Sequence, residues 1–176
     1  MQTVDTLIHA RWIIPVEPAG VYQHHCLVVD QGRIIALLPS QDVPLHYTAT
    51  TQLHLDQHAL IPGLVNAHTH AAMNLLRGLA DDLPLMDWLN NHIWPAENTW
   101  VDPEFVRDGT ELAIAEMLRG GTTCFNDMYF FPDVTARVAA HYGMRASVGL
   151  IMFDFPTAWA SGPEEYMHKG LALHDD

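Results

Sequence analysis

Two histidines separated by a single residue, His68 and His70, have the types and the spacing to bind a metal ion. They end the segment 60–70, LIPGLVNAHTH, which the pattern predicts as a buried strand that begins at the Pro62-Gly63 turn. Successive side chains of a strand alternate between its faces, so both imidazoles should project from the same face. Neutral imidazoles suit zinc, iron or nickel better than calcium or magnesium.

The His-x-His spacing alone is a weak signal, because two histidines at a strand end can equally bond to backbone or water. The flanking residues strengthen the metal interpretation. Asn66 should join the two histidines in a polar row along one face of an otherwise apolar strand. Such a row needs partners or a ligand to offset its loss of water. We therefore interpret His68 and His70 as ligands of one divalent metal ion.

The segment 60–70 and its continuation 71–82, AAMNLLRGLADD, resemble the first metal-binding strand of the amidohydrolase superfamily. The resemblance is strongest to the branch that deaminates 5′-methylthioadenosine and S-adenosylhomocysteine, and it extends to residues 144–146. It implies a metal-dependent hydrolase of non-peptide C–N bonds, in which His68 and His70 hold one catalytic zinc. Iron, nickel or manganese would fit two histidines as well.

The resemblance also implies a role for Glu97, which follows Trp94-Pro95 as does the family glutamate that binds the ribose hydroxyls. One carboxylate can accept the hydrogens of two vicinal hydroxyls. Without the resemblance, a solvated carboxylate in a turn at residues 94–97 is the preferred interpretation. A related guanine, cytosine or triazine hydrolase is the alternative function, and Glu97 discriminates because those substrates have no ribose diol.

Several apolar residues are candidates for a substrate pocket. Met73, Trp88, Met128 and Phe130 could surround a base and a methylthio group, although such side chains more often belong to a core. Asp127 lies at the end of a predicted strand, where it could orient a ligand or a loop, and a cap or turn role fits this residue type at least as well.

One departure from the family pattern bears on the substrate. Some members carry an arginine on the strand that corresponds to residues 144–151, where it meets the carboxylate of a homocysteine tail. Here Gly149 or Leu150 occupies that place, and Arg145 falls several residues earlier. Because an apolar side chain cannot bind a carboxylate, the sequence favours 5′-methylthioadenosine or adenosine over S-adenosylhomocysteine.

The elements that must position these residues fall into two parts. Residues 1–59 are predicted to form short antiparallel strands, as part of a small β-sandwich. Residues 60–176 alternate strands with helices, and strands at 60–70, 122–128 and 144–151 joined by crossover helices imply a parallel sheet. No Gly-x-Gly-x-x-Gly loop follows a strand, which disfavours an open doubly wound sheet. The fold class is α/β, the N-terminal part of a TIM-type (β/α)8 barrel.

The predicted barrel is incomplete. A complete one takes roughly 250 residues, and residues 60–176 hold about three of its eight strands. By the resemblance, the remaining metal ligands and the catalytic acid and base belong to later strands. We therefore expect this chain alone to be inactive. A shortened protein that binds a nucleoside, or that pairs with a full-length subunit, is the non-enzymatic alternative.

Composition disfavours a nucleic-acid polymer as a partner, and the resemblance implies a small-molecule nucleoside instead. The net charge of −13, from 8 Lys+Arg against 21 Asp+Glu, disfavours a nucleic-acid polymer. Cys26 and Cys124 have no spacing typical of a disulfide framework or of a thiolate metal site. Neither a leader peptide nor a membrane-length apolar run is predicted, so a cytoplasmic protein without membrane contact is expected. A homo-oligomer stays open on general grounds.

Overall fold

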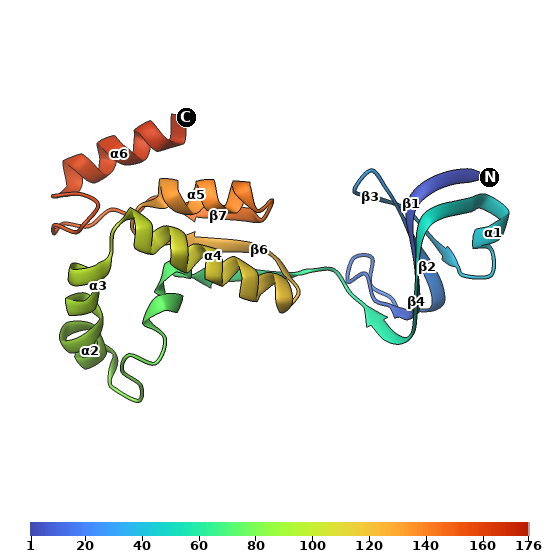
Figure 1. Ribbon diagram of the computed structural model, residues 1–176, viewed down its shortest axis with the longest axis horizontal. Helices are drawn as coiled ribbons and strands as arrows, with labels where there is room; N and C mark the ends of the chain where they lie inside the picture. The colour runs from blue at the N-terminus through green and yellow to red at the C-terminus, as the bar shows by residue number, and fades with distance from the viewer. Residues whose placement is uncertain (176) are drawn as a thin grey trace. The chain divides into compact units, whose positions relative to one another are not determined.

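The computed structural model describes residues 1–175, in two compact units that meet after Pro62. The first unit is Met1–Pro62 and the second begins at Gly63 (Figure 1). The sequence prediction placed this division after residue 59. Each unit is described by itself below.

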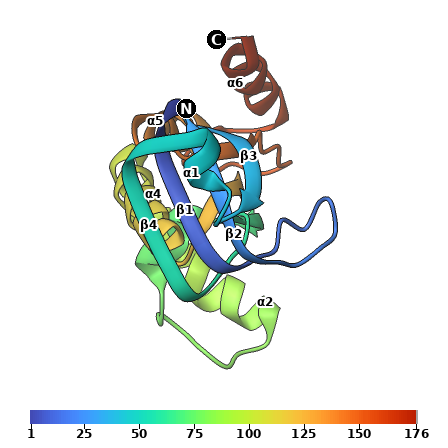
Figure 2. The same ribbon diagram turned by 90° about the vertical axis from the view of Figure 1, so that its right-hand side faces the viewer.

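The first unit is a mixed four-stranded sheet. Its elements are β1 (Gln2–Ile13), β2 (Tyr22–Asp30), β3 (Arg33–Pro39), the short helix α1 (Val43–His46) and β4 (Tyr47–Leu60). Figure 2 shows these strands side by side, in the order β3-β2-β1-β4. The antiparallel β1, β2 and β3 agree with the prediction, and Gln31 and Gly32 turn the chain between β2 and β3 with positive φ.

The prediction of a purely antiparallel sheet was wrong, because β4 pairs in parallel with β1. Residues 47–60 carry many polar side chains because β4 lies at an edge of the sheet, and most of them are exposed. This pairing joins residues about 45 positions apart across a long connection, as parallel strands require. Turn residues, which mark hairpins, therefore give no sign of it.

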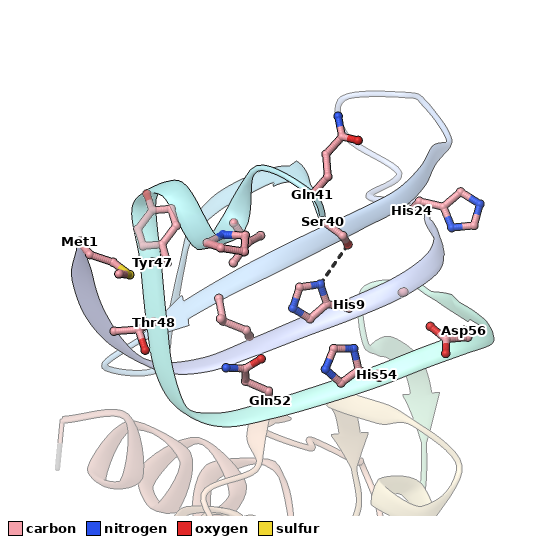
Figure 3. Close-up of a pocket in the computed structure, with 14 residues that line it drawn as sticks. Met1, His9, His24, Ser40, Gln41, Tyr47, Thr48, Gln52, His54 and Asp56 are labelled. Atoms are coloured by element: carbon pink, nitrogen blue, oxygen red, sulfur yellow. Dashed lines mark hydrogen bonds between the residues drawn. The ribbon is translucent and has the colours of Figure 1, made fainter.

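One face of the first sheet carries its core beside an open cleft. Val4, Leu7, Cys26, Val28 and Val43 form the buried cluster. The cleft, of about 610 Å³, lies next to it (Figure 3).

Three histidines line this cleft, His9, His24 and His54, and two of them stack on each other. The parallel register places His9 opposite His54, with ring centroids 4.7 Å apart and nearly parallel planes, and His9 Nδ1 is 3.0 Å from Ser40 Oγ (Figure 3). Within residues 1–175, no group of three His, Cys, Asp or Glu side chains is arranged to hold a metal ion.

The second unit confirms the predicted α/β class. Its parallel sheet, in the order β5-β6-β7, consists of β5 (Leu64–Thr69), β6 (Thr122–Met128) and β7 (Arg145–Gly149). The helical elements are η1 (Ala71–Leu76), α2 (Leu85–Trp88), the π-helical turn η2 (Leu89–Ile93), α3 (Trp94–Trp100), α4 (Pro103–Arg119), α5 (Pro132–His141) and α6 (Pro163–Asp175). Strands in chain order joined by helices are the repeating unit of a (β/α)8 barrel.

Helices α4 and α5 pack on one face of this sheet, as Figure 1 shows. Phe125 of β6 is fully buried in the core that they enclose. Asp102 caps α4 as predicted, accepting a hydrogen bond of 2.8 Å from the Phe105 N–H. At Gly109 a Cβ atom would lie 2.4 Å from the carbonyl oxygen of Ala72, so only glycine allows α4 to approach η1 this closely.

The other face of the sheet is open, which corrects the expectation that residues 60–70 form a buried strand. Leu64 and Val65 are 52% and 65% exposed. In a closed barrel, side chains from the other strands fill this inner face. No other strand of the described second unit packs over it. Strand β5 also lies at an edge of this sheet, so its apolar side chains are exposed although its composition predicted burial.

Both cysteines are free thiols. Cys26 is buried in the first unit, and burial raises the pKa of its thiol to about 11. Cys124 is half-buried on β6 in the second unit. Among residues 1–175, no helix has the length and apolar character needed to span a bilayer.

Candidate functional site

The chain brings His68 and His70 together at the C-terminal end of β5. Their ring centroids are 5.0 Å apart, in an edge-on arrangement with an interplanar angle of 78°. His68 is exposed and His70 is half-buried. The adjacency of the two imidazoles agrees with the spacing, and their role as metal ligands stays a prediction.

A backbone contact fixes the protonation of His70. Its Nδ1 lies 2.5 Å from the carbonyl oxygen of Met128, at the end of β6. A carbonyl oxygen only accepts hydrogen bonds, so Nδ1 is the donor, and in the neutral imidazole Nε2 then keeps its lone pair. Metal-binding histidines are commonly oriented by such a bond from the other ring nitrogen. His70 is therefore prepared to bind a cation through Nε2.

Asp127 holds the chain just beyond His70. Its side chain is 1% exposed, and Oδ1 accepts a hydrogen bond of 2.7 Å from the Ala71 N–H. Burial raises the pKa of this carboxyl, while the Ala71 N–H and the nearby His70 act in the opposite direction. Of the roles that the sequence left open for Asp127, the structure supports orienting a loop.

Asn66 does not join the two histidines in a polar row. The pairing of β5 with β6 shifts register between Asn66 and Thr69, which places an extra residue in β5 and breaks the alternation of side chains. The Asn66 amide nitrogen instead lies 3.8 Å from Met117 Sδ on α4. The predicted three-residue row was wrong, and the polar group at this strand end consists of the two histidines.

Glu97 lies on helix α3, so the predicted turn at residues 94–97 was also wrong. Pro95 occupies the first turn of α3, where its missing N–H breaks no helical hydrogen bond. The Glu97 side chain is not solvated, because the residue is only 9% exposed and one carboxylate oxygen accepts a 2.7 Å hydrogen bond from Tyr129 OH. Burial raises the pKa of Glu97, and the Tyr129 hydroxyl opposes that rise.

Sequence reasoning missed Tyr129. This buried residue follows β6 directly and connects the two polar parts of the site, since its hydroxyl bonds Glu97 and its ring centroid lies 6.2 Å from that of His70. Its position one residue beyond a predicted strand was the available signal, because barrel active sites are built at the C-terminal ends of strands.

One pocket joins these residues. It has a volume of about 310 Å³, and His70 and Glu97 both line it. The four apolar residues that the sequence proposed for a pocket line it too, namely Met73, Trp88, Met128 and Phe130. This arrangement offers an imidazole and a buried carboxylate to one ligand, with aromatic surfaces between them.

Comparison with known proteins finds a matching family model and similar curated proteins. The model of the Amidohydrolase family matches residues 59–175. The 5-methylthioadenosine/S-adenosylhomocysteine deaminase of Saccharophagus degradans is 54% identical over 173 residues, which are 98% of this chain and 39% of that protein. The protein of the same name from Teredinibacter turnerae is 49% identical over 174 residues, with the same two coverages. The chain thus spans about two fifths of these curated relatives.

Solved structures of similar proteins superpose on this chain. An adenosine deaminase from Xanthomonas campestris with bound zinc superposes with a TM-score of 0.95 at 53% identity, over 99% of this chain and 40% of that one. The guanine deaminase of E. coli superposes with a TM-score of 0.81 at 22% identity, over 97% and 43% of the two chains, and indicates the fold alone.

Proposed function

The chain belongs to the amidohydrolase family, and we propose that it supplies the N-terminal part of a zinc-dependent hydrolase that deaminates adenine nucleosides. The observation that carries the proposal is the pocket between His70 and Glu97. One ligand in this pocket can meet both a histidine that is oriented to bind a metal and a buried carboxylate that can accept hydrogen bonds from hydroxyl groups. The names of the relatives and of the Xanthomonas campestris structure support this assignment.

The residues present fit part of a zinc site. His68 and His70 are adjacent imidazoles, and the Met128 carbonyl leaves Nε2 of His70 free to bind. Catalytic zinc usually has three protein ligands, so others must join these two. When bound, zinc supplies a water of lowered pKa that can attack the ring carbon carrying the amino group. In the family, a later acid and base deliver the proton to the departing ammonia.

Glu97 would bind the ribose. A carboxylate has about four acceptor positions, and Tyr129 uses one of them. The others can accept the hydrogens of the 2′ and 3′ hydroxyls. The aromatic rings of Trp88 and Phe130 line the same pocket and offer flat surfaces for the purine.

The substrate we propose has no charged tail. Among the described residues, neither lysine nor arginine lines the pocket. Arg145 begins β7, so it lies where the parallel strands start, whereas the histidines lie where the strands end. These placements favour 5′-methylthioadenosine or adenosine over S-adenosylhomocysteine.

The test uses a completed enzyme, in which this chain replaces the aligned 173 residues of the Saccharophagus degradans relative. We expect it to bind zinc and to release ammonia from adenosine and from 5′-methylthioadenosine, and to stop when the metal is chelated. The alternative, a hydrolase of guanine or of triazines, predicts release from those compounds instead. A folded, zinc-loaded protein that deaminates neither nucleoside would contradict the proposal.

A further inference from the structure

The end of β6 holds the two-histidine segment that follows β5 at both of its ends. The amide nitrogen of Asn126 donates a hydrogen bond of 3.0 Å to the carbonyl oxygen of Ala67. The next residue, Asp127, accepts a hydrogen bond of 2.7 Å from the N–H of Ala71. Ala67 immediately precedes the His-x-His sequence, and Ala71 immediately follows it. Two neighbouring side chains of one strand therefore fix the main chain before and after the proposed metal ligands.

The contact with Asn126 lies where the regular pairing of the sheet is interrupted. Strand β5 shifts register against β6 between Asn66 and Thr69, so Ala67 and His68 have no paired residue in β6. The carbonyl oxygen of Ala67 takes its hydrogen bond from the Asn126 side chain instead. Because an irregularity of this kind changes the direction of the side chains beside it, the bond from Asn126 fixes the course of the chain where it carries His68.

The contact with Asp127 comes from the interior of the second unit. Asp127 is 1% exposed, and Thr135 of α5, which is fully buried, lies close enough for its hydroxyl to lower the pKa of Asp127. A hydrogen bond from an N–H to a carboxylate is stronger than one to a neutral acceptor. The N–H of Ala71 is thus tied to a charged group that the packed core keeps in place.

His70 is held at three points as a result. Its ring Nδ1 bonds the Met128 carbonyl, and its own carbonyl oxygen accepts a hydrogen bond of 2.9 Å from the Met73 N–H. The third point is the bond between the following N–H, of Ala71, and Asp127. One bond therefore sets the direction of the ring and two set the main chain that carries it. Ligands held in place before a metal arrives bind it more tightly.

We infer that Asn126 and Asp127 are positioning residues of the zinc site, which set the separation and direction of the His68 and His70 imidazoles by holding the main chain on either side of them. The inference rests on the proposed function, because it takes the two histidines as zinc ligands. Each positioning residue acts through a peptide group beside a histidine rather than on the metal itself.

The first experiment measures the zinc affinity of the completed enzyme by competition with a chelator of known affinity. Asp127→Ala should weaken zinc binding by about ten- to a hundredfold, as removal of a group that orients a metal ligand does. Asp127→Asn keeps an acceptor for the Ala71 N–H and should recover most of that loss. Asn126→Ala should weaken zinc binding by about tenfold, the lower end of the range, because Asn126 is exposed.

Val138→Ala is the matched control for a loss of stability. Val138 is buried on α5 in the same core that surrounds the helix side of β6. Its truncation removes packing and should lower the free energy of unfolding. Zinc affinity should nevertheless equal that of the wild type, because the folded state keeps both contacts to the histidine segment. Weakened zinc binding in Asp127→Ala then reflects position rather than stability.

The second experiment needs no variant, so it decides the matter even where Asp127→Ala does not fold. Coupling between two equilibria is reciprocal, so a bond that supports zinc binding must itself be stabilised by zinc. Hydrogen exchange of the Ala71 N–H in the wild-type completed enzyme should slow by about tenfold or more when zinc is added. The Phe105 N–H, which bonds the carboxylate of Asp102 at the start of α4, should exchange equally fast with and without zinc.

The outcomes distinguish the inference from the proposed function. If the wild type binds zinc and deaminates adenosine, but both alanine variants bind zinc equally tightly, the positioning inference is wrong and the proposed function stands. Unchanged exchange of the Ala71 N–H on zinc addition, or a loss that Asp127→Asn does not restore, contradicts the inference for Asp127. If His70→Asn leaves the zinc affinity of the completed enzyme unchanged, the assignment of the ligand is wrong and both proposals fail.

Discussion

At the scale of single residues, each polar group of the pocket depends on one neighbour. His70 relies on a backbone carbonyl, which sets the ring nitrogen that stays free. Glu97 relies on a tyrosine hydroxyl, which compensates part of the cost of burying a carboxylate. One hydrogen bond thus orients His70, and one hydrogen bond stabilises the buried carboxylate of Glu97.

Replacing Glu97 should remove discrimination at the ribose. In the completed enzyme we expect Glu97→Gln to lower kcat/KM for adenosine by about tenfold, because hydrogen bonds to a charged group are lost. Turnover of 2′-deoxyadenosine should fall much less, so the ratio of the two substrates should approach one. Steady-state kinetics with both nucleosides provide the measurement and its internal control. An unchanged ratio would show that Glu97 does not contact the 2′-hydroxyl.

Removing the Tyr129 hydroxyl should shift the pH profile. Burial raises the pKa of Glu97 and the hydroxyl of Tyr129 lowers it, so Tyr129→Phe should raise it further. Because nucleoside binding needs the carboxylate form, the acid limb of kcat/KM should move to higher pH in the variant. The profile of Tyr22→Phe, which changes a tyrosine of the first unit, should match the wild type. A shift to lower pH for Tyr129→Phe would contradict this assignment.

The residues proposed to bind a ligand could be chosen from the sequence, but the groups that support them could not. His68 and His70 stand out by their type and spacing, whereas Glu97 was singled out only through the family resemblance. The partner of His70 is a main-chain oxygen of Met128, and any residue at that position offers the same atom. Tyr129 is recognisable only once α3 brings Glu97 beside it, across 32 positions of sequence.

At the scale of elements, the position of His70 depends on how closely η1 and α4 approach. His70 immediately precedes η1, and α4 contacts η1 along the backbone at Gly109. A helix interior usually favours alanine over glycine. Glycine is needed here because the atoms that a Cβ would meet belong to the main chain and cannot move by rotating a side chain.

Gly109→Ala should therefore destabilise the second unit. Overpacking of this kind costs about 1–3 kcal/mol in the free energy of unfolding. Gly170→Ala is the matched control, because a Cβ at Gly170 on α6 meets its nearest atoms, from Leu150, at an ordinary 3.7 Å. That change should leave stability equal or raise it by up to about 1 kcal/mol. Urea unfolding followed by circular dichroism measures both, and equal stability of the two variants would contradict the argument.

Strands with local signals were predictable, whereas elements set by distant contacts were not. The strand at residues 122–128 was placed at its observed bounds, because Gly120 and Gly121 end the helix before it. Strand β4 was missed, since its partner β1 lies far away in sequence. Helix α3 was taken for a turn because of Pro95, and its position after a π-helical turn is what accommodates that proline.

At the scale of the whole molecule, the proposed zinc site would draw only two ligands, His68 and His70, from this chain. Three parallel strands leave the inner face of the sheet open, and the curated relatives extend over more than twice this length. The fold class could be predicted because the strand-helix repeats indicate a parallel sheet, and the missing Gly-x-Gly-x-x-Gly loop and the resemblance of residues 60–82 favour a barrel over an open sheet. The exposure of β5 could not, since an apolar strand gives no sign of which neighbours bury it.

The 176-residue chain should therefore bind zinc weakly by itself. Two imidazoles provide fewer contacts than the three protein ligands of a catalytic site. We expect its zinc affinity to be at least about a hundredfold below that of the completed enzyme, and we expect no ammonia release from adenosine. Isothermal titration with zinc measures the first quantity, with His68→Asn and His70→Asn as controls. Binding as tight as in the completed enzyme would mean that the chain supplies further ligands.

The burial of Cys26 makes its thiol a natural probe for the opening of the first unit. Each unit carries one cysteine, Cys26 in the first and Cys124 in the second, and neither is consumed in a disulfide. Cys26 is buried and its pKa of about 11 keeps it protonated, so alkylation requires the first sheet to open. A pulse of alkylating reagent followed by peptide mass spectrometry would record the opening of the first unit at Cys26, with the half-buried Cys124 as the reference thiol in the same sample.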